Sequence, residues 1–185
     1  RIYVVSNGVG EKFTKVYPQY KGKIRLFRNL LNKEEILKKS RTGIGFTDDF
    51  EGIRLLTVGR LHYQKGYDIA IEALGRILKD GYRVRWYVIG EGMERVNLEA
   101  LIKKHGLEED FILMGKKNNP YPYMAQADIY VQGTRFEGKS IAIEEAQILG
   151  KAIAASDCTG NTEQIESGYD GILFPLKVGN LVREL

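Results

Sequence analysis

Short apolar runs alternate with amphipathic stretches along most of the chain. Runs rich in aliphatic and aromatic residues predict strands at 53–59, 84–90, 111–115, 128–133 and 151–156, with others at 23–27 and 171–175. The apolar spacing between these runs predicts helices at 67–79, 93–105, 121–126, 140–149 and 161–167. Strands that are apolar throughout are typical of sheets covered on both faces. The pattern therefore predicts a doubly wound parallel α/β sheet of about six strands.

The two ends of the chain depart from this pattern. Residues 1–22 contain one strand-like run followed by a polar stretch with Gly and Pro, so we interpret them as a linker or the end of another unit. We assign residues 23–185 to the sheet domain, with 43–52 as a loop. The chain starts at Arg1 and stops in the helical pattern "VGNLVREL". We therefore expect a piece of a longer protein, truncated at its C-terminal helix.

The composition is that of an ordinary globular protein. Hydrophobic residues make up 43% and charged residues 28%, and no apolar run approaches the length of a membrane span. The net charge is +4, but the basic residues are scattered. This disfavours a nucleic-acid partner, and an anionic small molecule or an anionic membrane face fits equally well. Cys158 is the single cysteine, which is consistent with a reducing compartment.

The first candidate site loop is "GRLHYQKG", which follows the strand at 53–59. In open parallel sheets, ligands bind beyond the carboxyl ends of the strands. Arg60 and Lys65 lie in this loop, and Lys65 precedes Gly66 at the start of a helix, where backbone amides favour an anion. The alternative, two solvated surface cations, carries similar weight.

Two further signals do not support a cofactor or metal site. "GEGMER" begins like a dinucleotide fingerprint, but Arg95 replaces the third glycine and the acidic residue Asp110 precedes the next strand instead of ending it. We therefore interpret it as a tight strand-to-helix turn. His62 and His105 have no partners at metal-ligand spacing, so we predict no metal site.

The helix at 140–149 carries two adjacent glutamates. At 100° per residue its apolar positions form one broad face, comprising Ile141, Ala142, Ala146, Ile148 and Leu149. Glu145 falls inside this face, whereas Glu144 falls outside it and is expected to face solvent. A carboxylate on an apolar face is costly unless it is paired or hydrogen-bonded. Glu145 is therefore a candidate ligand-binding residue, and a structural glutamate bonded to amides or an Arg is the alternative.

Glu137 lies ahead of the same helix, beside Gly138, which allows close approach of a ligand. The amides of Lys139, Ser140 and Ile141 would point from the helix start toward an anion. A carboxylate there would repel a phosphate, so we expect Glu137 to bind hydroxyls beyond it. Together these features suggest a ligand with a central diphosphate and hydroxyl-rich groups at both ends, which is the shape of a nucleotide-sugar.

Several segments resemble the C-terminal, donor-binding half of the family 4 retaining glycosyltransferases of GT-B fold. Glu137 and Glu145 match the E-x7-E pattern in "RFEGKSIAIEEA", and residues 58–66 match "VGR…KG". Residues 119–131 and 150–165 match two further family segments, so the resemblance covers 53–175 in order. It implies a Rossmann-like domain that forms one half of a GT-B enzyme. Lys139 and Gly133-Thr134 depart from the usual residues without removing a charged ligand-binding position.

The resemblance also implies a role for each site residue. Glu137 would position the donor sugar near the reacting carbon, and Glu145 would bind the ribose. The other implied roles are diphosphate binding by Arg60, Lys65, Gly138, Lys139, Ser140 and Ile141, and proximity to the base for Gly115 and Lys116. The donor would be a UDP- or GDP-linked sugar, and stabilisation of the leaving group would need no metal or other cofactor.

The implied function is that of a retaining hexosyltransferase acting on a glycan or lipid-linked acceptor. The acceptor half would be missing here, so we expect this chain alone to bind the donor and to transfer sugar poorly. The alternatives are a nucleotide-sugar-binding module without transferase activity, a GT-B-fold epimerase and a phosphorylase. We expect a cytoplasmic location, and the mild positive charge is compatible with peripheral association at the cytoplasmic membrane face.

Overall fold

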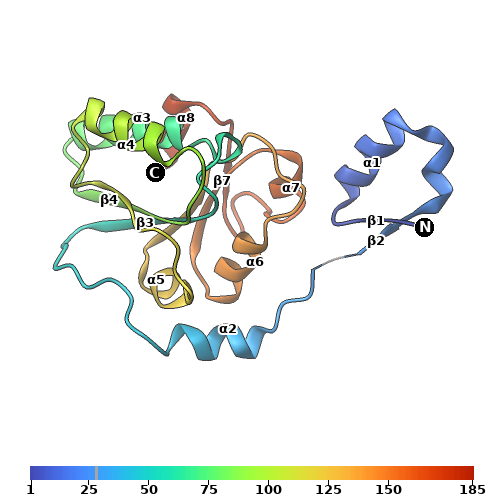
Figure 1. Cartoon of the computed structure of the whole chain (residues 1–185), viewed down its shortest axis with the longest axis horizontal. Coiled ribbons are helices and arrows are strands. Elements are labelled where there is room, and N and C mark those ends of the chain that lie inside the picture. Colours follow the sequence, from blue (N-terminus) through green and yellow to red (C-terminus); the bar gives the residue numbers. More distant parts are fainter. Residues whose placement is uncertain (28) are drawn as a thin grey trace.

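The computed structural model describes residues 1–27 and 29–185, which form an α/β body and a small N-terminal unit (Figure 1). The strands are β1 (Ile2–Val4), β2 (Ile24–Leu26), β3 (Ile53–Val58), β4 (Val84–Ile89), β5 (Phe111–Leu113), β6 (Ile129–Gln132), β7 (Ala152–Ser156) and β8 (Ile172–Phe174). The helices are α1 (Asn7–Val16), α2 (Lys33–Ser40), α3 (Tyr67–Lys79), α4 (Arg95–His105), α5 (Tyr121–Gln126), α6 (Ile141–Ile148), α7 (Thr159–Thr162) and α8 (Val178–Glu184), with short 3₁₀ helices η1 (Pro18–Lys23) and η2 (Tyr63–Lys65).

The body is built on a six-stranded parallel sheet in the order β5-β4-β3-β6-β7-β8, which confirms the predicted doubly wound α/β class. Helices α3, α4 and α8 cover one face, and α5 and α6 cover the other (Figure 1). Trp86 and Leu74 are central to the first core, and Tyr130 and Ile143 to the second. The strand order reverses between β3 and β6, and such a switch point opens a crevice at the carboxyl ends of the strands.

Residues 1–27 form the N-terminal unit, in which β1 and β2 pair in parallel and are connected by α1 and η1. The expectation that the strand at 23–27 belongs with the sheet domain was wrong, because β2 pairs with β1. Its alternation of Ile24, Arg25 and Leu26 suits an exposed strand, whereas the central strands of the body are apolar nearly throughout. Arg28, which directly follows the predicted strand at 23–27, lies outside the described residues.

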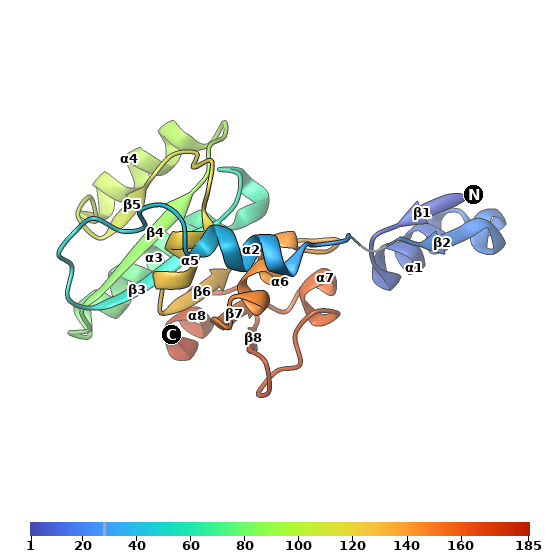
Figure 2. The same cartoon turned by 90° about the horizontal axis from the view of Figure 1, so that it is seen from below.

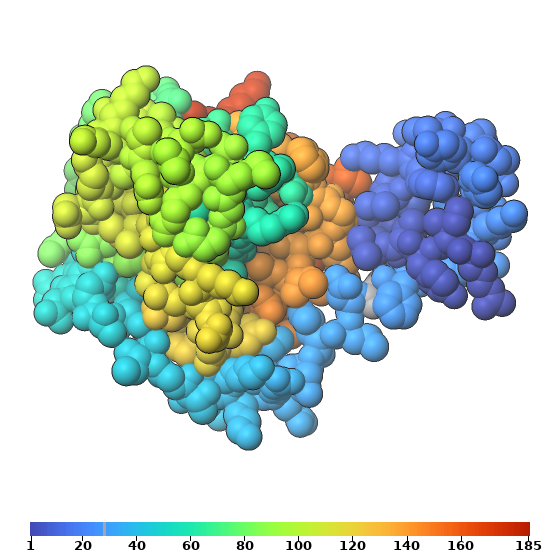
Figure 3. Space-filling model, in the orientation of Figure 1, coloured from blue at the N-terminus to red at the C-terminus, as the bar shows by residue number. Residues whose placement is uncertain are grey.

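The N-terminal unit lies at one end of the body and is connected to it by the segment that leads to α2 (Figure 2). Helix α1 contacts α7, and Figure 3 shows the blue atoms of the unit meeting the orange atoms of the body across a narrow zone. The unit therefore touches the part of the chain that follows the predicted E-x7-E segment.

Two element assignments need correction. Residues 7–16, which fell in the polar stretch interpreted as a linker or the end of another unit, form α1, and the side chain of Ser6 caps this helix by accepting a hydrogen bond from the amide of Val9. The helix predicted at 161–167 is instead the short α7, at 159–162. It cannot continue to 167 because the following residues form a turn in which Gly168 adopts a φ of 88°.

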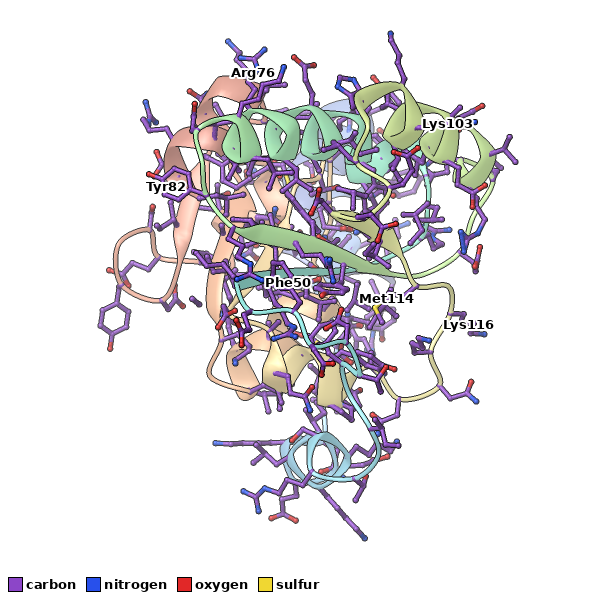
Figure 4. The ribbon with its side chains drawn as sticks, turned by 90° about the vertical axis from the view of Figure 1, so that its left-hand side faces the viewer. Phe50, Arg76, Tyr82, Lys103, Met114 and Lys116 are labelled. Carbon is purple, nitrogen blue, oxygen red and sulfur yellow. The ribbon has the colours of Figure 1, made fainter. Side chains whose placement is uncertain are left out.

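The loop at 43–52 was predicted correctly and covers part of the sheet. Phe46 packs on Tyr87, with ring centroids 4.4 Å apart, and the guanidinium of Arg85 lies 4.4 Å from the ring centre of Phe50. Figure 4 shows Phe50 against the sheet, whereas Lys116 lies on the loop that leaves β5 at the outer margin of the body. The aromatic side chains therefore anchor a segment that has no regular structure of its own.

Candidate functional site

Two loops flank the switch point of the sheet. One follows β3 and contains Arg60 and Lys65, and the other follows β6 and contains Glu137. Because β3 and β6 are paired neighbours, their carboxyl ends bring these loops side by side. The topology thus places the predicted cationic loop and the predicted glutamate loop at one position.

Lys65 and Glu137 contact each other directly across this position. The Lys65 Nζ donates a hydrogen bond to Glu137 Oε2 at 2.7 Å, and the two side chains are only 14% and 15% exposed. An ammonium carries three donors, so Lys65 can hold this carboxylate and still donate to another oxygen. The two charges thus neutralise each other at the ends of β3 and β6, but the ammonium of Lys65 keeps the capacity to donate further hydrogen bonds.

A set of hydrogen bonds holds the two loops in register. The carbonyl of Gln64 accepts from the Arg135 amide at 2.8 Å and from the Thr134 hydroxyl at 2.9 Å. Arg135 also binds Asp68 with two nitrogen atoms, at 2.9 and 2.6 Å. A two-point guanidinium–carboxylate contact restricts orientation as well as distance. The positions of Lys65 and Glu137 are therefore fixed by their neighbours on both loops.

Glu145 lies on α6 and accepts a hydrogen bond from the hydroxyl of Tyr121, at 2.8 Å from Oε1. Burial raises the pKa of Glu145 above its ordinary value, while the Tyr121 contact lowers it and the charge of Glu144 raises it. Burial and the nearby carboxylate raise the pKa of Tyr121 to about 12. Glu145 is thus half-buried, and a neutral donor rather than a cation satisfies one of its oxygens.

The predicted face of α6 was partly wrong. Ile143 and Ala146 are the fully buried positions, while Ile141 is 45% exposed. Ala146 belongs to the predicted apolar face but Ile143 does not, so the buried side is rotated away from the predicted face, and Glu144 and Glu145 lie on either side of it. Helix geometry defines relative angles only, and the position of the sheet determines which side is buried.

Glu144 does not face open solvent, contrary to the expectation. It forms an ion pair with Lys139 at 2.5 Å, and the two side chains are 21% and 13% exposed. Its second oxygen, Oε2, is buried and has no hydrogen-bond partner within the described part of the chain. Lys139 therefore neutralises Glu144 in this structure.

The start of α6 offers fewer amides than predicted. The Ser140 amide donates to Gln164 Oε1 at 2.7 Å, so it is already occupied, and the Ser140 hydroxyl caps the helix by accepting from the Ile143 amide. The amides of Lys139 and Ile141 have no acceptor among residues 1–27 and 29–185. Two of the three predicted amides thus remain available.

The remaining predicted residues lie on loops at the same edge of the sheet. Arg60 is exposed and follows β3, and Gly115 and Lys116 follow β5, on the far side of β4. Gly115 has a φ of 71°, which favours glycine. Among the described residues, no hydrogen bond or salt bridge joins Arg60, Gly115 or Lys116 to Glu137 or Glu145.

The turn predicted at 90–95 is confirmed, and it explains both of its glycines. A Cβ on Gly90 would lie 1.9 Å from the Gly59 carbonyl oxygen, and one on Gly92 would lie 2.2 Å from that of Leu61. The glycines allow the loops after β3 and β4 to touch. Within the described ranges, no cluster of His, Cys, Asp or Glu is arranged to hold a metal ion, and no helix is long and apolar enough to cross a bilayer.

The sequence reasoning missed the residues that support the site. Tyr121 had no signal beyond its place in a family-like segment, since its partner Glu145 lies 24 residues away. Gln64 and Arg135 stood inside the candidate loops but carried no pattern that indicated each other. Only the pairing of β3 with β6 brings them together.

The fold defines a class of protein. The six-stranded parallel sheet with helices on both faces is a Rossmann-like domain of the kind found in glycosyltransferases of GT-B fold. The family model for glycosyl transferases group 1 matches residues 49–184. The chain belongs to this family.

Individual relatives agree with this assignment. The chain is 33% identical over 135 residues to the N-acetylgalactosamine-N,N'-diacetylbacillosaminyl-diphospho-undecaprenol 4-alpha-N-acetylgalactosaminyltransferase of Campylobacter jejuni, covering 73% of this chain and 35% of that protein. It is 30% identical over 123 residues to the alpha-D-kanosaminyltransferase of Streptomyces kanamyceticus, covering 65% and 32%. The chain thus spans about a third of the length of these relatives.

Solved structures show the same fold. Anabaena Alr3699/HepE in complex with UDP superposes with a TM-score of 0.81 at 22% identity, covering 98% of this chain and 51% of that one. A glycosyltransferase from Rickettsia africae superposes with the same TM-score at 20% identity, covering 99% and 51%. Both alignments include the N-terminal unit, because they extend over nearly the whole chain.

Proposed function

We propose that this chain is the donor-binding part of a retaining, family 4 type glycosyltransferase that uses a nucleotide-diphosphate sugar. The observation that carries the proposal is the Lys65–Glu137 pair at the switch point of the sheet, 2.7 Å between Nζ and Oε2. It combines a cation suited to a phosphate with a carboxylate suited to sugar hydroxyls.

In the proposed complex, Lys65 keeps its contact with Glu137 and adds a hydrogen bond to the donor diphosphate. Arg60, which is exposed at the end of β3, supplies a second cation, and the free amides of Lys139 and Ile141 supply further donors. When the bond to the sugar breaks, negative charge grows on the leaving diphosphate. Donors that are already oriented stabilise that charge without reorganisation.

Glu145 is proposed to bind the two ribose hydroxyls of the nucleotide. A ribose diol donates two hydrogen bonds, and the Tyr121 hydroxyl occupies only part of the accepting capacity of the carboxylate. Such hydrogen bonds favour the ionised form and would offset the burial that raises the pKa of Glu145. Gly115 and Lys116 would then lie near the base.

The remaining parts of the proposal concern the whole protein. The UDP named for the Anabaena structure supports a nucleoside diphosphate as the ligand, and the undecaprenol diphosphate in the name of the Campylobacter relative supports a lipid-linked acceptor. We propose a UDP- or GDP-linked sugar as the donor and a reaction that requires no metal. A cytoplasmic location at the membrane face would suit such an acceptor.

Isothermal titration with UDP, GDP and ADP tests the proposal on this chain. We expect one diphosphate to bind, and Lys65→Ala and Glu145→Gln to weaken its binding. Glu109→Gln is the control, because Glu109 is an exposed glutamate in the loop before β5. Absence of binding by all three nucleotides at millimolar concentration would refute donor binding by this chain.

A further inference from the structure

Glu163 connects the body of the protein to the N-terminal unit. Its Oε2 accepts a hydrogen bond from the Asn7 amide at 2.9 Å, and its Oε1 accepts one from the Gly8 amide at 2.6 Å. These amides begin α1, whose first turn contains no acidic residue of its own. A carboxylate from more than 150 positions away therefore occupies the site where a helix favours negative charge.

These two bonds are the polar connection between the parts. Among residues 1–27 and 29–185, no other hydrogen bond or salt bridge joins the N-terminal unit to the rest of the chain. Next to the contact lies a cavity of about 230 Å³ with polar residues from both parts, including Lys139 and Glu144. The interface is thus narrow, and Glu163 supplies its directional contacts.

The apolar contacts around Glu163 are close. A Cβ on Gly8 would lie 2.1 Å from Thr159 Cγ2, so only glycine allows α1 to approach α7 this closely. A Cβ on Gly138 would lie 3.2 Å from a methyl group of Val9. The N-terminal unit therefore rests on both α7 and the loop that carries Glu137.

Helix α7 also packs closely against the backbone of the loop that carries Glu137. A Cβ on Gly160 would lie 2.6 Å from the carbonyl oxygen of Glu137 and 2.8 Å from its carbonyl carbon. Gly160 and Glu163 lie less than one helical turn apart in sequence. The helix α1, the α7 region and the backbone at Glu137 are therefore in successive close contact.

We propose that Glu163 is a positioning residue that fastens α1 to α7 and so sets the orientation of the N-terminal unit against the Glu137 loop. The groups that this carboxylate binds are the first backbone amides of α1. Gly8 on α1 and Gly138 on the loop that carries Glu137 allow the two parts to approach closely. Loss of the carboxylate removes the only hydrogen bonds that, among the described residues, hold the unit in this orientation.

Pulsed electron–electron double resonance, which measures the distance between two spin labels, tests the proposed role of Glu163 directly. Labels are placed at Lys12→Cys in α1 and Lys104→Cys in α4, both exposed, in a Cys158→Ser background. We expect a narrow distance distribution in the parent, and a broad or shifted one in Glu163→Ala and Glu163→Gln. Glu166→Gln, an exposed glutamate of the following turn, is the matched control and should leave the distribution unchanged.

Steric variants test the same contact without altering any charge. Gly8→Ala should displace α1, because its Cβ would lie 2.1 Å from Thr159 Cγ2 and 2.8 Å from Glu163 Oε1. Adding Thr159→Ala removes the closer of these two overlaps and should recover part of the parent distance. Amide exchange at Asn7 and Gly8, followed by NMR, should accelerate by about ten-fold or more in Glu163→Ala, as expected for loss of hydrogen bonds to a charged group. The exchange of core amides in β3 should stay unchanged, which separates undocking from unfolding.

A second readout rests on the proposed function. If Glu137 contacts the donor sugar, Glu163→Ala should weaken the binding of a nucleotide-sugar more than the binding of the corresponding nucleoside diphosphate. Failure of nucleotide binding in the parent would refute the proposed function, while the label distances would still decide the role of Glu163. An unchanged distance distribution in both Glu163 variants and in Gly8→Ala would overturn the inference.

Discussion

Replacing Glu145 with Gln should make the protein more stable while weakening its proposed ligand binding. Burial raises the pKa of Glu145 above its ordinary value of 4.5, so the folded state disfavours the ionised form. Gln removes that charge and can still accept the hydrogen bond of Tyr121. Because the carboxylate is partly exposed, solvent screening limits the gain to about 0.5–1 kcal/mol. In a domain of this size that raises the melting temperature by about 1–4 °C.

The effect has a defined pH dependence. With its pKa raised on folding, Glu145 binds more protons in the folded than in the unfolded state at pH values just above 4.5. The stability of the parent is therefore lost as pH rises from 4.5 through the folded pKa. Below that range the carboxyl is protonated in both states, and the folded state carries no cost for a buried charge. The advantage of Glu145→Gln should be absent near pH 4 and complete near pH 7. Thermal melts across this range measure it.

Ligand binding should change in the opposite direction. A neutral amide replaces the carboxylate that is proposed to accept the ribose hydroxyls, and hydrogen bonds to charged groups contribute about 1.5–3 kcal/mol. Titration should thus show a loss of nucleoside diphosphate affinity of roughly ten- to a hundred-fold. A variant that melts at a lower temperature and binds nucleotide as tightly as the parent would refute both the burial argument and the assigned role.

Three further variants test neighbouring contacts. Glu137→Gln should free Lys65 from its ion pair and strengthen binding of inorganic pyrophosphate several-fold, which titration would show; weaker binding would count against the pairing. Gly90→Ala should lower the unfolding free energy by about 3 kcal/mol or more in urea melts, because its Cβ would overlap the Gly59 carbonyl; a near-neutral effect would show that the loops can separate. Tyr121→Phe should weaken nucleotide binding by about three- to ten-fold, since a net hydrogen bond contributes about 0.5–1.5 kcal/mol; unchanged affinity would exclude a positioning role.

The sequence predicted the body of the fold well because its strands signal their own burial. A run such as Val84–Ile89 is apolar enough to require cover on both faces, and this alone implies helices on either side of a parallel sheet. The N-terminal unit was harder to predict. Its strand β2 alternates apolar and charged residues, and α1 contains two glycines, so neither element carries a strong signal. Ser6 caps α1 locally, but Glu163 binds the two amides before Val9, and no local pattern could reveal that contact.

The site was predictable as a set of loops but not as a set of contacts. Position after a strand predicted Lys65 and Glu137 separately, whereas their pairing depends on β3 lying beside β6. The same limit explains the error at Glu144. Its angle on α6 was calculated correctly, but the neighbouring Lys139 and the N-terminal unit cover the side that would otherwise face solvent.

The two glutamates of the E-x7-E pattern differ in what neutralises them, and this difference has a consequence for ligand binding. Glu137 is paired with the ammonium of Lys65, so a diphosphate that approaches the site meets a cation whose charge is already partly balanced. Glu145 is paired with the neutral hydroxyl of Tyr121, so it retains a net charge that only hydrogen-bond donors can stabilise. Glu145 would repel a free diphosphate, whereas in the proposed complex a nucleotide brings a diol to that position. We therefore expect tighter binding of a nucleoside diphosphate than of inorganic pyrophosphate, because of the unequal pairing of the two carboxylates.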